Sequence, residues 1–529
     1  MTVLSVQDKV AHKQQIQQLA DAVNILIASG KFDDAKKICR AALDLMPDNA
    51  EFLIKLGAIL LYHEEVEESL ELFEHALKFE PNSPAIYGNM ASALKKQGRI
   101  DESIACNMKA VALNPGDPAQ YSNLLMTMIY AASVSPQELA AMARAFGKLV
   151  EPLRRQRPLI RDKNPARKLR IGYVSPDFRD HPVNYFFEPL LMQHDRRQFE
   201  IFAYSNCSRE DHVTARLKMA CDHWRNITTL TDDAAADLIE TDGIDVLVDL
   251  GGHSGGNRLL VFAHKPAPVQ VTWLGYPATS GMKAMDYRIT DNYAEPVGMT
   301  EHLNVETLWR LPGMFCCYQA NENSPPVIDH PPFEDNGYIT FGCFNNFAKA
   351  TEPVLNTWAR IMAQVPDSRL LLESAAFAGP KFRETLLEKL NRQALPPERV
   401  ILEPRTKENQ FVLYNRIDVA LDPFPCNGGT TSTDTLWMGV PLITLAGGHF
   451  ASRMGATILT NAGLHELIAK DTDEYVRLAV DLAQDRNRLR SLRHNLRDRV
   501  AASPMMNQGA FARNMETAYR EMWRKWCAS

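Results

Sequence analysis

The stretch that decides the fold runs from Asp418 to Pro441 and reads DVALDPFPCNGGTTSTDTLWMGVP. Its apolar start at 419–421 is typical of a buried strand, while the prolines and the Gly428-Gly429 pair indicate a loop. Helical spacing follows Thr431. The pattern therefore predicts a strand, a glycine loop and a helix start. In an α/β sheet such a turn directs backbone amides and the positive end of a helix dipole at a phosphate.

The side chains of this stretch allow two interpretations. In the first, Gly428 and Gly429 permit a close backbone approach, and Thr430 and Thr431 add hydroxyl donors. Asp434, one helical turn later, then accepts bonds from ribose hydroxyls as acidic residues do in dinucleotide sites. In the second, Thr430 merely caps the helix, and Asp434 occupies the first turn because acids are favoured there. The stretch alone favours neither.

Composition limits the class of protein. The chain has 529 residues, which predicts about three or four domains. A formal net charge of −6 is small for this length and indicates neither nucleic-acid nor membrane binding. The nine cysteines include no C-x-x-C pair, so we expect no metal site and no disulfide framework. With no signal-peptide pattern and no run of 18 apolar residues, we expect a cytoplasmic protein.

The first part of the chain is repetitive. Pro47, Pro81 and Pro115 follow one another at a spacing of 34 residues, and small residues recur in the same register. This period is typical of tetratricopeptide repeats, which stack pairs of helices. We predict repeats over residues 15–134 and a helical connector over 135–168. The concave face of such an array binds a protein or peptide. Because the array is short, self-association into a homo-oligomer is an equal alternative.

Strand and helix patterns alternate twice after the connector. Strand-like runs at 169–174, 199–204, 246–250 and 269–273 predict one parallel sheet, and those at 338–341, 369–372, 400–402 and 442–445 predict a second. We place one Rossmann-like domain at 169–332 and another at 333–529, separated by proline-rich sequence. The fold class is thus α + α/β. Two such units bind a nucleotide-linked ligand in the cleft between them.

Several residues that follow predicted strands carry reactive or charged groups. His181 could exchange a proton near neutral pH, and His253 lies in a glycine-rich loop that could wrap an anion. Lys349 could neutralise phosphate charge as a leaving group departs, and Lys407 lies on the same rim. Each also has a plainer interpretation: a loop histidine is often structural, and a loop lysine is often a solvated surface residue.

Motifs in fixed order give the chain a resemblance. GYVSPDFRDH at 172–181, PAPVQVTWLGYPATSG at 266–281, FNNFAK at 344–349 and NGGTTSTDTLWMGVP at 427–441 are followed by ASPMMNQGAFARNMETAYREMW. Together they resemble the protein O-glycosyltransferase family typified by O-GlcNAc transferase and SPINDLY, over about residues 170–526. The resemblance implies a GT-B fold and an inverting enzyme that uses no metal or other cofactor. It would move a sugar from a nucleotide-sugar donor to serine or threonine.

The resemblance also implies roles for individual residues. His181 matches the active-site histidine, and Lys349 matches the lysine that stabilises the departing diphosphate. Contacts to the nucleotide sugar are implied for Asn346, Lys407, Gly428, Gly429, Thr430, Thr431 and Asp434. His181 is the first candidate for the general base; a donor phosphate oxygen, a relayed water or Asp237 are alternatives.

The resemblance points to two different nucleotide-sugar donors. O-GlcNAc transferase has histidines at the positions of Gln410 and Gly429, whereas Lys407 and Asp434 resemble the enzymes that use UDP-GlcNAc. Several other runs resemble SPINDLY, for which GDP-fucose is the implied donor. UDP-GlcNAc is the first choice and GDP-fucose the alternative; a non-catalytic repeat scaffold is a further one.

The D-x-D at 471–473 precedes a helical pattern, so we interpret it as a helix cap.

Overall fold

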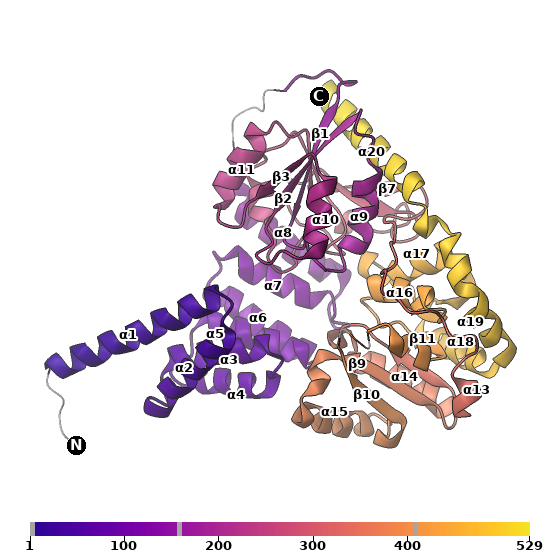
Figure 1. Ribbon diagram of the computed structural model, residues 1–529, viewed down its shortest axis with the longest axis horizontal. Helices are drawn as coiled ribbons and strands as arrows, with labels where there is room; N and C mark the ends of the chain where they lie inside the picture. Colours follow the sequence, from indigo (N-terminus) through magenta and orange to yellow (C-terminus); the bar gives the residue numbers. More distant parts are fainter. Residues whose placement is uncertain (1–5, 156–160, 407, 409) are drawn as a thin grey trace.

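The structure is a computed structural model that describes residues 6–155, 161–406, 408 and 410–529. Figure 1 shows a stack of helices at the N-terminal end and two parallel sheets, each with helices on its faces. No helix in the described part of the chain is long and apolar enough to cross a bilayer. The predicted fold class is confirmed.

The N-terminal stack consists of consecutive antiparallel helices. Short turns join them, and proline occupies the first turn of three of them, where its missing N–H removes no helical bond. In chain order they are α1 (Val6–Ala28), α2 (Phe32–Leu45), α3 (Ala50–Tyr62), α4 (Val66–Leu77), α5 (Pro84–Lys96), α6 (Ile100–Leu113), α7 (Pro118–Met128) and α8 (Pro136–Val150).

Residues 34 positions apart in the repeats make equivalent contacts between helices. Ser69 Oγ donates to the Gly57 carbonyl at 2.7 Å, and Ser103 Oγ donates to the Ala91 carbonyl at 2.6 Å. A Cβ on Gly57 would lie 2.6 Å from the Phe73 ring, so the two helices approach too closely there for a side chain. The small residues of the repeat are therefore required where helices cross.

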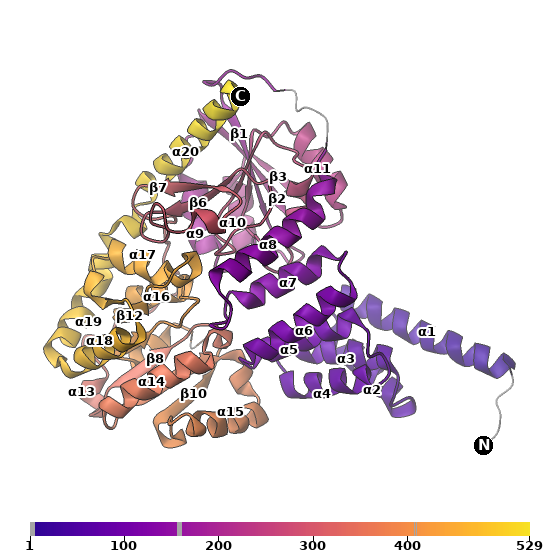
Figure 2. The same cartoon turned by 180° about the vertical axis from the view of Figure 1, so that it is seen from behind.

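The last two helices of the stack join the repeats to the first sheet. Leu124 of α7 and Phe146 of α8 belong to the same buried cluster as Leu247 of that sheet. Figure 2 shows α7 and α8 between the other repeats and the first sheet unit. We predicted α8 as part of a connector, but it packs as the partner of α7. The repeats also reach the second unit, where Lys381 Nζ lies 2.7 Å from Glu71 Oε1.

The first sheet is entirely parallel and has the order β3-β2-β1-β4-β5-β6-β7. Its helices cover both faces, so the central strands β4 and β5 are buried along their whole length. The strands are β1 (Leu169–Ser175), β2 (Phe199–Ser205), β3 (His223–Asn226), β4 (Val246–Asp249), β5 (Val269–Thr272), β6 (Tyr287–Asp291) and β7 (Thr307–Leu311). The helices are α9 (Asn184–Gln193), α10 (His212–Ala220), α11 (Asp232–Thr241) and α12 (Leu259–Ala263).

The second sheet repeats this plan with the order β10-β9-β8-β11-β12-β13. Its strands are β8 (Thr340–Cys343), β9 (Arg369–Ser374), β10 (Val400–Pro404), β11 (Val419–Leu421), β12 (Leu442–Leu445) and β13 (Ile468–Ala469). Its helices are α13 (Phe333–Asn336), α14 (Glu352–Gln364), α15 (Pro380–Arg392), α16 (Thr430–Trp437), α17 (Met454–Asn461), α18 (Thr472–Gln484) and α19 (Arg486–Ala501). Short 3-10 helices, among them η3 (Phe347–Lys349), lie in the loops.

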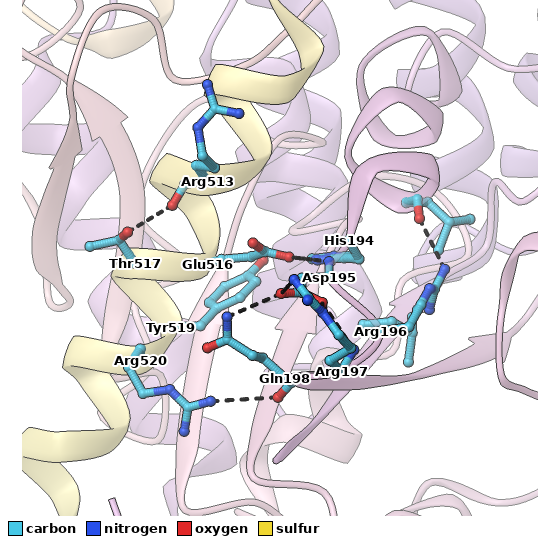
Figure 3. A network of polar contacts seen from close by, with 12 residues as sticks. His194, Asp195, Arg196, Arg197, Gln198, Arg513, Glu516, Thr517, Tyr519 and Arg520 are labelled. Atoms are coloured by element: carbon cyan, nitrogen blue, oxygen red, sulfur yellow. Dashed lines mark hydrogen bonds and ion pairs between the residues drawn. The ribbon is translucent and has the colours of Figure 1, made fainter. Parts of the chain in front are cut away.

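The last helix, α20 (Gln508–Ala528), leaves the second unit and packs on the first (Figure 1). Figure 3 shows Glu516 of α20 reaching the end of α9, where its Oε1 accepts from the Asp195 amide at 2.7 Å and lies 3.0 Å from His194 Nδ1. The Tyr519 and Tyr173 hydroxyls lie 3.3 Å apart beneath it. The predicted range 333–529 thus contains a helix that belongs spatially to the first sheet.

The strand orders explain where a ligand would bind. In the first sheet the chain order reverses at β1, between β2 and β4, and in the second it reverses at β8, between β9 and β11. Loops that leave such neighbouring strands in opposite directions open a crevice at their carboxyl ends. The loops that carry His181, Lys349 and the Gly428-Gly429 turn all begin at these strands.

Candidate functional site

A buried carboxylate, that of Asp422, forms hydrogen bonds that stabilise the glycine turn between β11 and α16. Asp422 Oδ1 accepts from the Gly428 amide at 2.7 Å and from Ser432 Oγ at 3.2 Å, while Oδ2 accepts from Thr444 Oγ1 at 2.7 Å. Burial raises the pKa of Asp422 to about 6, and Lys349 and these donors oppose that rise. Asp422 therefore fixes the turn, a role that the sequence pattern did not reveal.

The start of α16 has no side-chain cap. Gly429 occupies the N-cap position, and Thr430 is already the first helical residue. The interpretation of Thr430 as a cap is therefore wrong. The first amides of any helix lack partners within it, so an uncapped start presents them, together with the positive end of the dipole, to a bound anion.

The two glycines of the turn differ sharply in the space around them. A Cβ on Gly428 would lie 2.2 Å from Ser432 Oγ and 2.9 Å from Asn345 Oδ1, whereas a Cβ on Gly429 would meet no atom within 4 Å. Only Gly428 is thus required by close packing.

We expect Gly428→Ala to displace the start of α16 and to weaken nucleotide affinity by at least about tenfold, because one lost charge-assisted bond is worth about 1.5–3 kcal/mol. Gly429→Ala is the matched control and should leave the melting temperature unchanged. Calorimetric titration and melting curves of both variants provide the test. Equal behaviour of the two alanines would contradict this description of the turn.

Lys349 is in direct contact with the glycine turn. It ends η3, just after β8, and its Nζ donates to the Asn427 carbonyl at 2.7 Å and to Asn345 Oδ1 at 3.3 Å. Asn346, by contrast, is exposed, and its Oδ1 accepts from the Ala348 amide at 3.1 Å. Asn345 was not singled out from the sequence, although it stands beside Asn346 in the same motif.

Asp434 connects the two sheet units. It is buried on α16, and its Oδ1 accepts from the Tyr318 hydroxyl at 2.5 Å. Tyr318 lies in the segment that leads from β7 to the second unit. Burial raises the pKa of Asp434 to about 7, against the opposing effects of Tyr318 and Arg405. Tyr318 was missed because nothing local marks a tyrosine whose partner is so distant in the chain.

His181 lies across the cleft in the loop after β1. Its Nδ1 accepts from the Val183 amide at 3.3 Å, and its Nε2 lies 3.6 Å from Asp177 Oδ1. Desolvation, with a smaller effect of Arg179, lowers the pKa of His181 to about 4, so the ring is neutral at pH 7. Burial raises the pKa of Asp177 to about 6.

A short segment links the surroundings of His181 to Asp434. After Tyr318, the Gln319 amide donates to the Tyr185 carbonyl at 2.7 Å, and Asn321 Nδ2 donates to the Tyr185 hydroxyl at 2.7 Å. The same segment therefore contacts Asp434 on one side and α9, next to His181, on the other. Lys349 and the glycine turn are in direct contact, and the segment 318–321 connects Asp434 to the helix that follows His181.

Two other candidates lie elsewhere, and a third is outside the described residues. His253 is buried where the repeats meet the first sheet, with Nδ1 3.0 Å from Ser122 Oγ and Nε2 3.1 Å from the Ser280 carbonyl. Asp237 is on the outer helix α11, where its carboxylate lies 2.8 Å from Arg155. Lys407 lies outside the described residues.

The D-x-D sequence caps a helix, as predicted. Asp471 Oδ1 accepts from the Glu474 amide at 2.8 Å at the start of α18, and Asp473 pairs with Arg360 at 2.6 Å. Within the described ranges, no group of three or more histidine, cysteine, aspartate or glutamate side chains is arranged to hold a metal ion.

Comparison with known proteins identifies the family. Residues 153–319 and 333–515 match the model of glycosyl transferase family 41, and residues 60–126 match a tetratricopeptide-repeat model. The chain belongs to glycosyl transferase family 41. Its two Rossmann-like units, which follow the repeats, form the GT-B arrangement that the resemblance implied.

Family 41 relatives are similar over most of this chain. The probable UDP-N-acetylglucosamine-peptide N-acetylglucosaminyltransferase SPINDLY of Arabidopsis thaliana is 43% identical over 371 residues, which are 69% of this chain and 40% of that protein. SEC, described in the same words and from the same plant, is 32% identical over 68% of this chain and 38% of that protein. The chain thus spans about 40% of the length of these relatives.

A solved family structure matches the whole architecture. It is a lysine-to-methionine mutant of the O-GlcNAc transferase from Thermobaculum terrenum, with a TM-score of 0.92 and 35% identity. The match covers 98% of both chains, so the repeats, both sheets and the crossing helix share one arrangement.

Proposed function

We propose that this chain is an inverting protein O-glycosyltransferase that moves a sugar, GlcNAc from UDP-GlcNAc as first choice, onto serine or threonine of proteins. One observation carries the proposal: Lys349 Nζ donates to the carbonyl of Asn427, which lies two residues before Gly429, the N-cap position of α16. A cation and a helix N-terminus thus converge on one position, which suits a diphosphate. The family membership and the O-GlcNAc transferase structure support this assignment.

The reaction would be a single displacement at the anomeric carbon. The acceptor oxygen attacks from the face opposite the diphosphate, the bond from carbon to the diphosphate oxygen breaks, and the configuration inverts. Lys349 and the first amides of α16 would stabilise the charge that develops on the departing diphosphate, at about 3 kcal/mol for each well-aimed donor. Held side by side in the cleft, the reactants gain further from orientation.

His181 is the proposed general base. Because its pKa lies near 4, the ring is neutral over the physiological range. Nε2 would accept the acceptor's hydroxyl proton in the tautomer that carries its hydrogen on Nδ1, and that tautomer gives up the bond from the Val183 amide. Protonated Nε2 would then face Asp177, 3.6 Å away, which stabilises the imidazolium. A phosphate oxygen of the donor and a relayed water are the alternatives.

A second donor, GDP-fucose, is favoured by one observation. Gly429 leaves open space at the turn, at a position where O-GlcNAc transferase has a histidine. This space could accept a different base. In either case the donor carries a diphosphate, so the roles of Lys349 and α16 are unchanged.

A donor screen tests the function directly. A ligand that binds only the folded state raises the melting temperature, and at 100 times its Kd it adds about 2.7 kcal/mol of stability. We expect UDP-GlcNAc to raise the midpoint more than GDP-fucose or UDP-glucose, and the binding donor to release its diphosphate when a protein acceptor is added. A chain that no donor stabilises, yet that binds protein partners, would be the repeat scaffold instead.

We propose that the repeats present the protein acceptor to the cleft. Between them and the second unit lies a cavity of about 550 Å³, lined by the start of α6, the turn before α8 and the start of α14. A Cβ on Gly98 of the repeats would lie 3.4 Å from the ring of Phe347, which stands two residues before Lys349. An acceptor that follows the repeats would therefore pass close to the proposed site.

A further inference from the structure

A polar pocket beside His181 is used by none of the proposed chemistry. It has a volume of about 280 Å³ and lies between the loop after β1, the N-terminal turns of α9 and α10, and the segment 319–323. His181 and Tyr185 form part of its wall, so an occupant of this pocket would lie next to the proposed reaction centre.

The charge of the pocket is negative. Arg216 is its one arginine, and Glu188 neutralises it through two bonds of 2.9 and 3.0 Å. Glu322 is 74% exposed and forms a longer ion pair with the same arginine, at 3.7 Å. Asp180, on the opposite wall, forms no ion pair and no side-chain hydrogen bond with any residue in the described part of the chain. Glu188, Glu322 and Asp180 thus share one arginine, and the carboxylates of the pocket outnumber its arginines.

A second observation, independent of charge, points to a ligand that donates hydrogen bonds. Asn184 lines the pocket and is 4% exposed. Its Nδ2 donates to the Asp177 carbonyl at 2.6 Å and to the Arg179 carbonyl, which fixes the orientation of the amide. The remaining Asn184 Oδ1 has no partner among the described residues. A buried acceptor without a donor is uncommon and costly, so a donor from a bound group would satisfy it.

We propose that this pocket is a subsite for a lysine or arginine side chain of the acceptor protein, close to the serine or threonine that receives the sugar. An ammonium or guanidinium group carries only donors and a positive charge, which matches an excess of carboxylates over arginines and an unpaired amide oxygen. A phosphate or an acidic side chain is excluded by the same charge. The inference rests on the proposed function, which it deepens by naming the acceptor's chemistry.

The first experiment compares serine peptides that differ at one position. Lysine, norleucine and glutamate are placed in turn at each position within five residues of the serine, and kcat/KM is measured by diphosphate release. We expect the kcat/KM of the peptide with lysine at one position to exceed that of the norleucine peptide by about fivefold. An exposed ion pair contributes up to about 1 kcal/mol, which corresponds to about fivefold in affinity. A set of peptides with no charge preference at any position would overturn the proposal.

Variants of the pocket's carboxylates test whether the preference for lysine peptides arises there. In the Asp180→Asn, Glu322→Gln double variant the lysine advantage should vanish, while kcat/KM for the norleucine peptide stays within twofold. Glu521→Gln removes one exposed carboxylate of α20 and should preserve the advantage. Asp180→Lys with Glu322→Lys should instead favour the glutamate peptide. A lysine preference that survives the double variant would place the charge recognition elsewhere.

A binding measurement separates this inference from the proposed function. Fluorescent peptides with alanine in place of serine are titrated with the chain at low and high salt, and anisotropy gives the affinity without any turnover. The lysine peptide should bind about fivefold more tightly than the norleucine peptide, and the difference should disappear in the double variant and at 1 M salt. This result would support the subsite even if no donor were consumed. Equal affinities in the presence of normal transfer would refute the subsite alone.

Discussion

Lys349→Met should abolish sugar transfer while leaving the fold intact. The variant cannot donate to the diphosphate, and the loss of one such donor typically costs a factor of about 10² to 10³ in kcat. In the free protein the change removes two hydrogen bonds, those to Asn427 and Asn345, from a half-buried side chain. We therefore expect a small fall in melting temperature, far less than the loss of turnover would suggest. Diphosphate release, coupled to a colour reaction, measures the rate.

The control for this variant is a lysine of the same sheet unit that lies away from the cleft. Lys381 on α15 is exposed and pairs with Glu71 of the repeats, so Lys381→Met removes an equal charge without touching the turn. Its turnover should stay near that of the natural chain. If Lys349→Met retains turnover within a few fold, Lys349 has no part in the departure of the diphosphate.

Asp434→Asn should weaken nucleotide binding by about tenfold or more, because a neutral amide loses the charge-assisted bonds that a carboxylate forms with ribose hydroxyls. The folding stability of the variant, in contrast, should rise relative to that of the natural chain as the pH increases. The pKa of Asp434 is raised from 3.8 to about 7, so its contribution to stability is fully present below about pH 3.8 and is lost as the pH rises through about 7. Asparagine does not titrate. The melting temperature of the variant, relative to the natural chain, should therefore increase between pH 5 and pH 8.

Two measurements separate these effects. Calorimetric titration with the donor's nucleoside diphosphate gives the affinity, and melting curves from pH 5 to pH 8 give the stability. Tyr318→Phe is the companion variant, because it removes the hydroxyl that Asp434 accepts from but keeps the carboxylate. Unchanged nucleotide affinity in Asp434→Asn would end the ribose assignment, whatever the melting curves show.

Local patterns in the sequence predicted much of the architecture. The 34-residue spacing and the strand-helix alternation are properties of neighbouring residues, and the repeat contacts of Ser69 and Ser103 follow directly from them. The strands β3, β6, β7 and β13 were not predicted. β3 consists of four half-buried or exposed residues at the sheet edge, HWRN, and such a segment has no apolar run to detect.

The site was predicted less completely, for a physical reason. Lys349, Asp434 and the glycine turn lie in recognisable sequence motifs. Asp422 and Tyr318 were missed because their roles depend on hydrogen-bond partners that approach them only in the folded chain. The position of α20 escaped prediction for the same reason. An amphipathic helix shows that it covers something, but its sequence does not say which sheet.

The crossing of α20 has a consequence for the order in which this molecule is built. Tyr173 on β1 and Tyr519 on α20 are neighbours in space but 346 residues apart in the chain. During synthesis, domains generally fold as units from the N-terminal end. Here the first sheet emerges early, yet the face that receives Phe511, Met515 and Trp523 stays uncovered until the second sheet has been made. The earlier sheet is thus completed last, and part of its apolar surface stays uncovered in the nascent chain until α20 has been made.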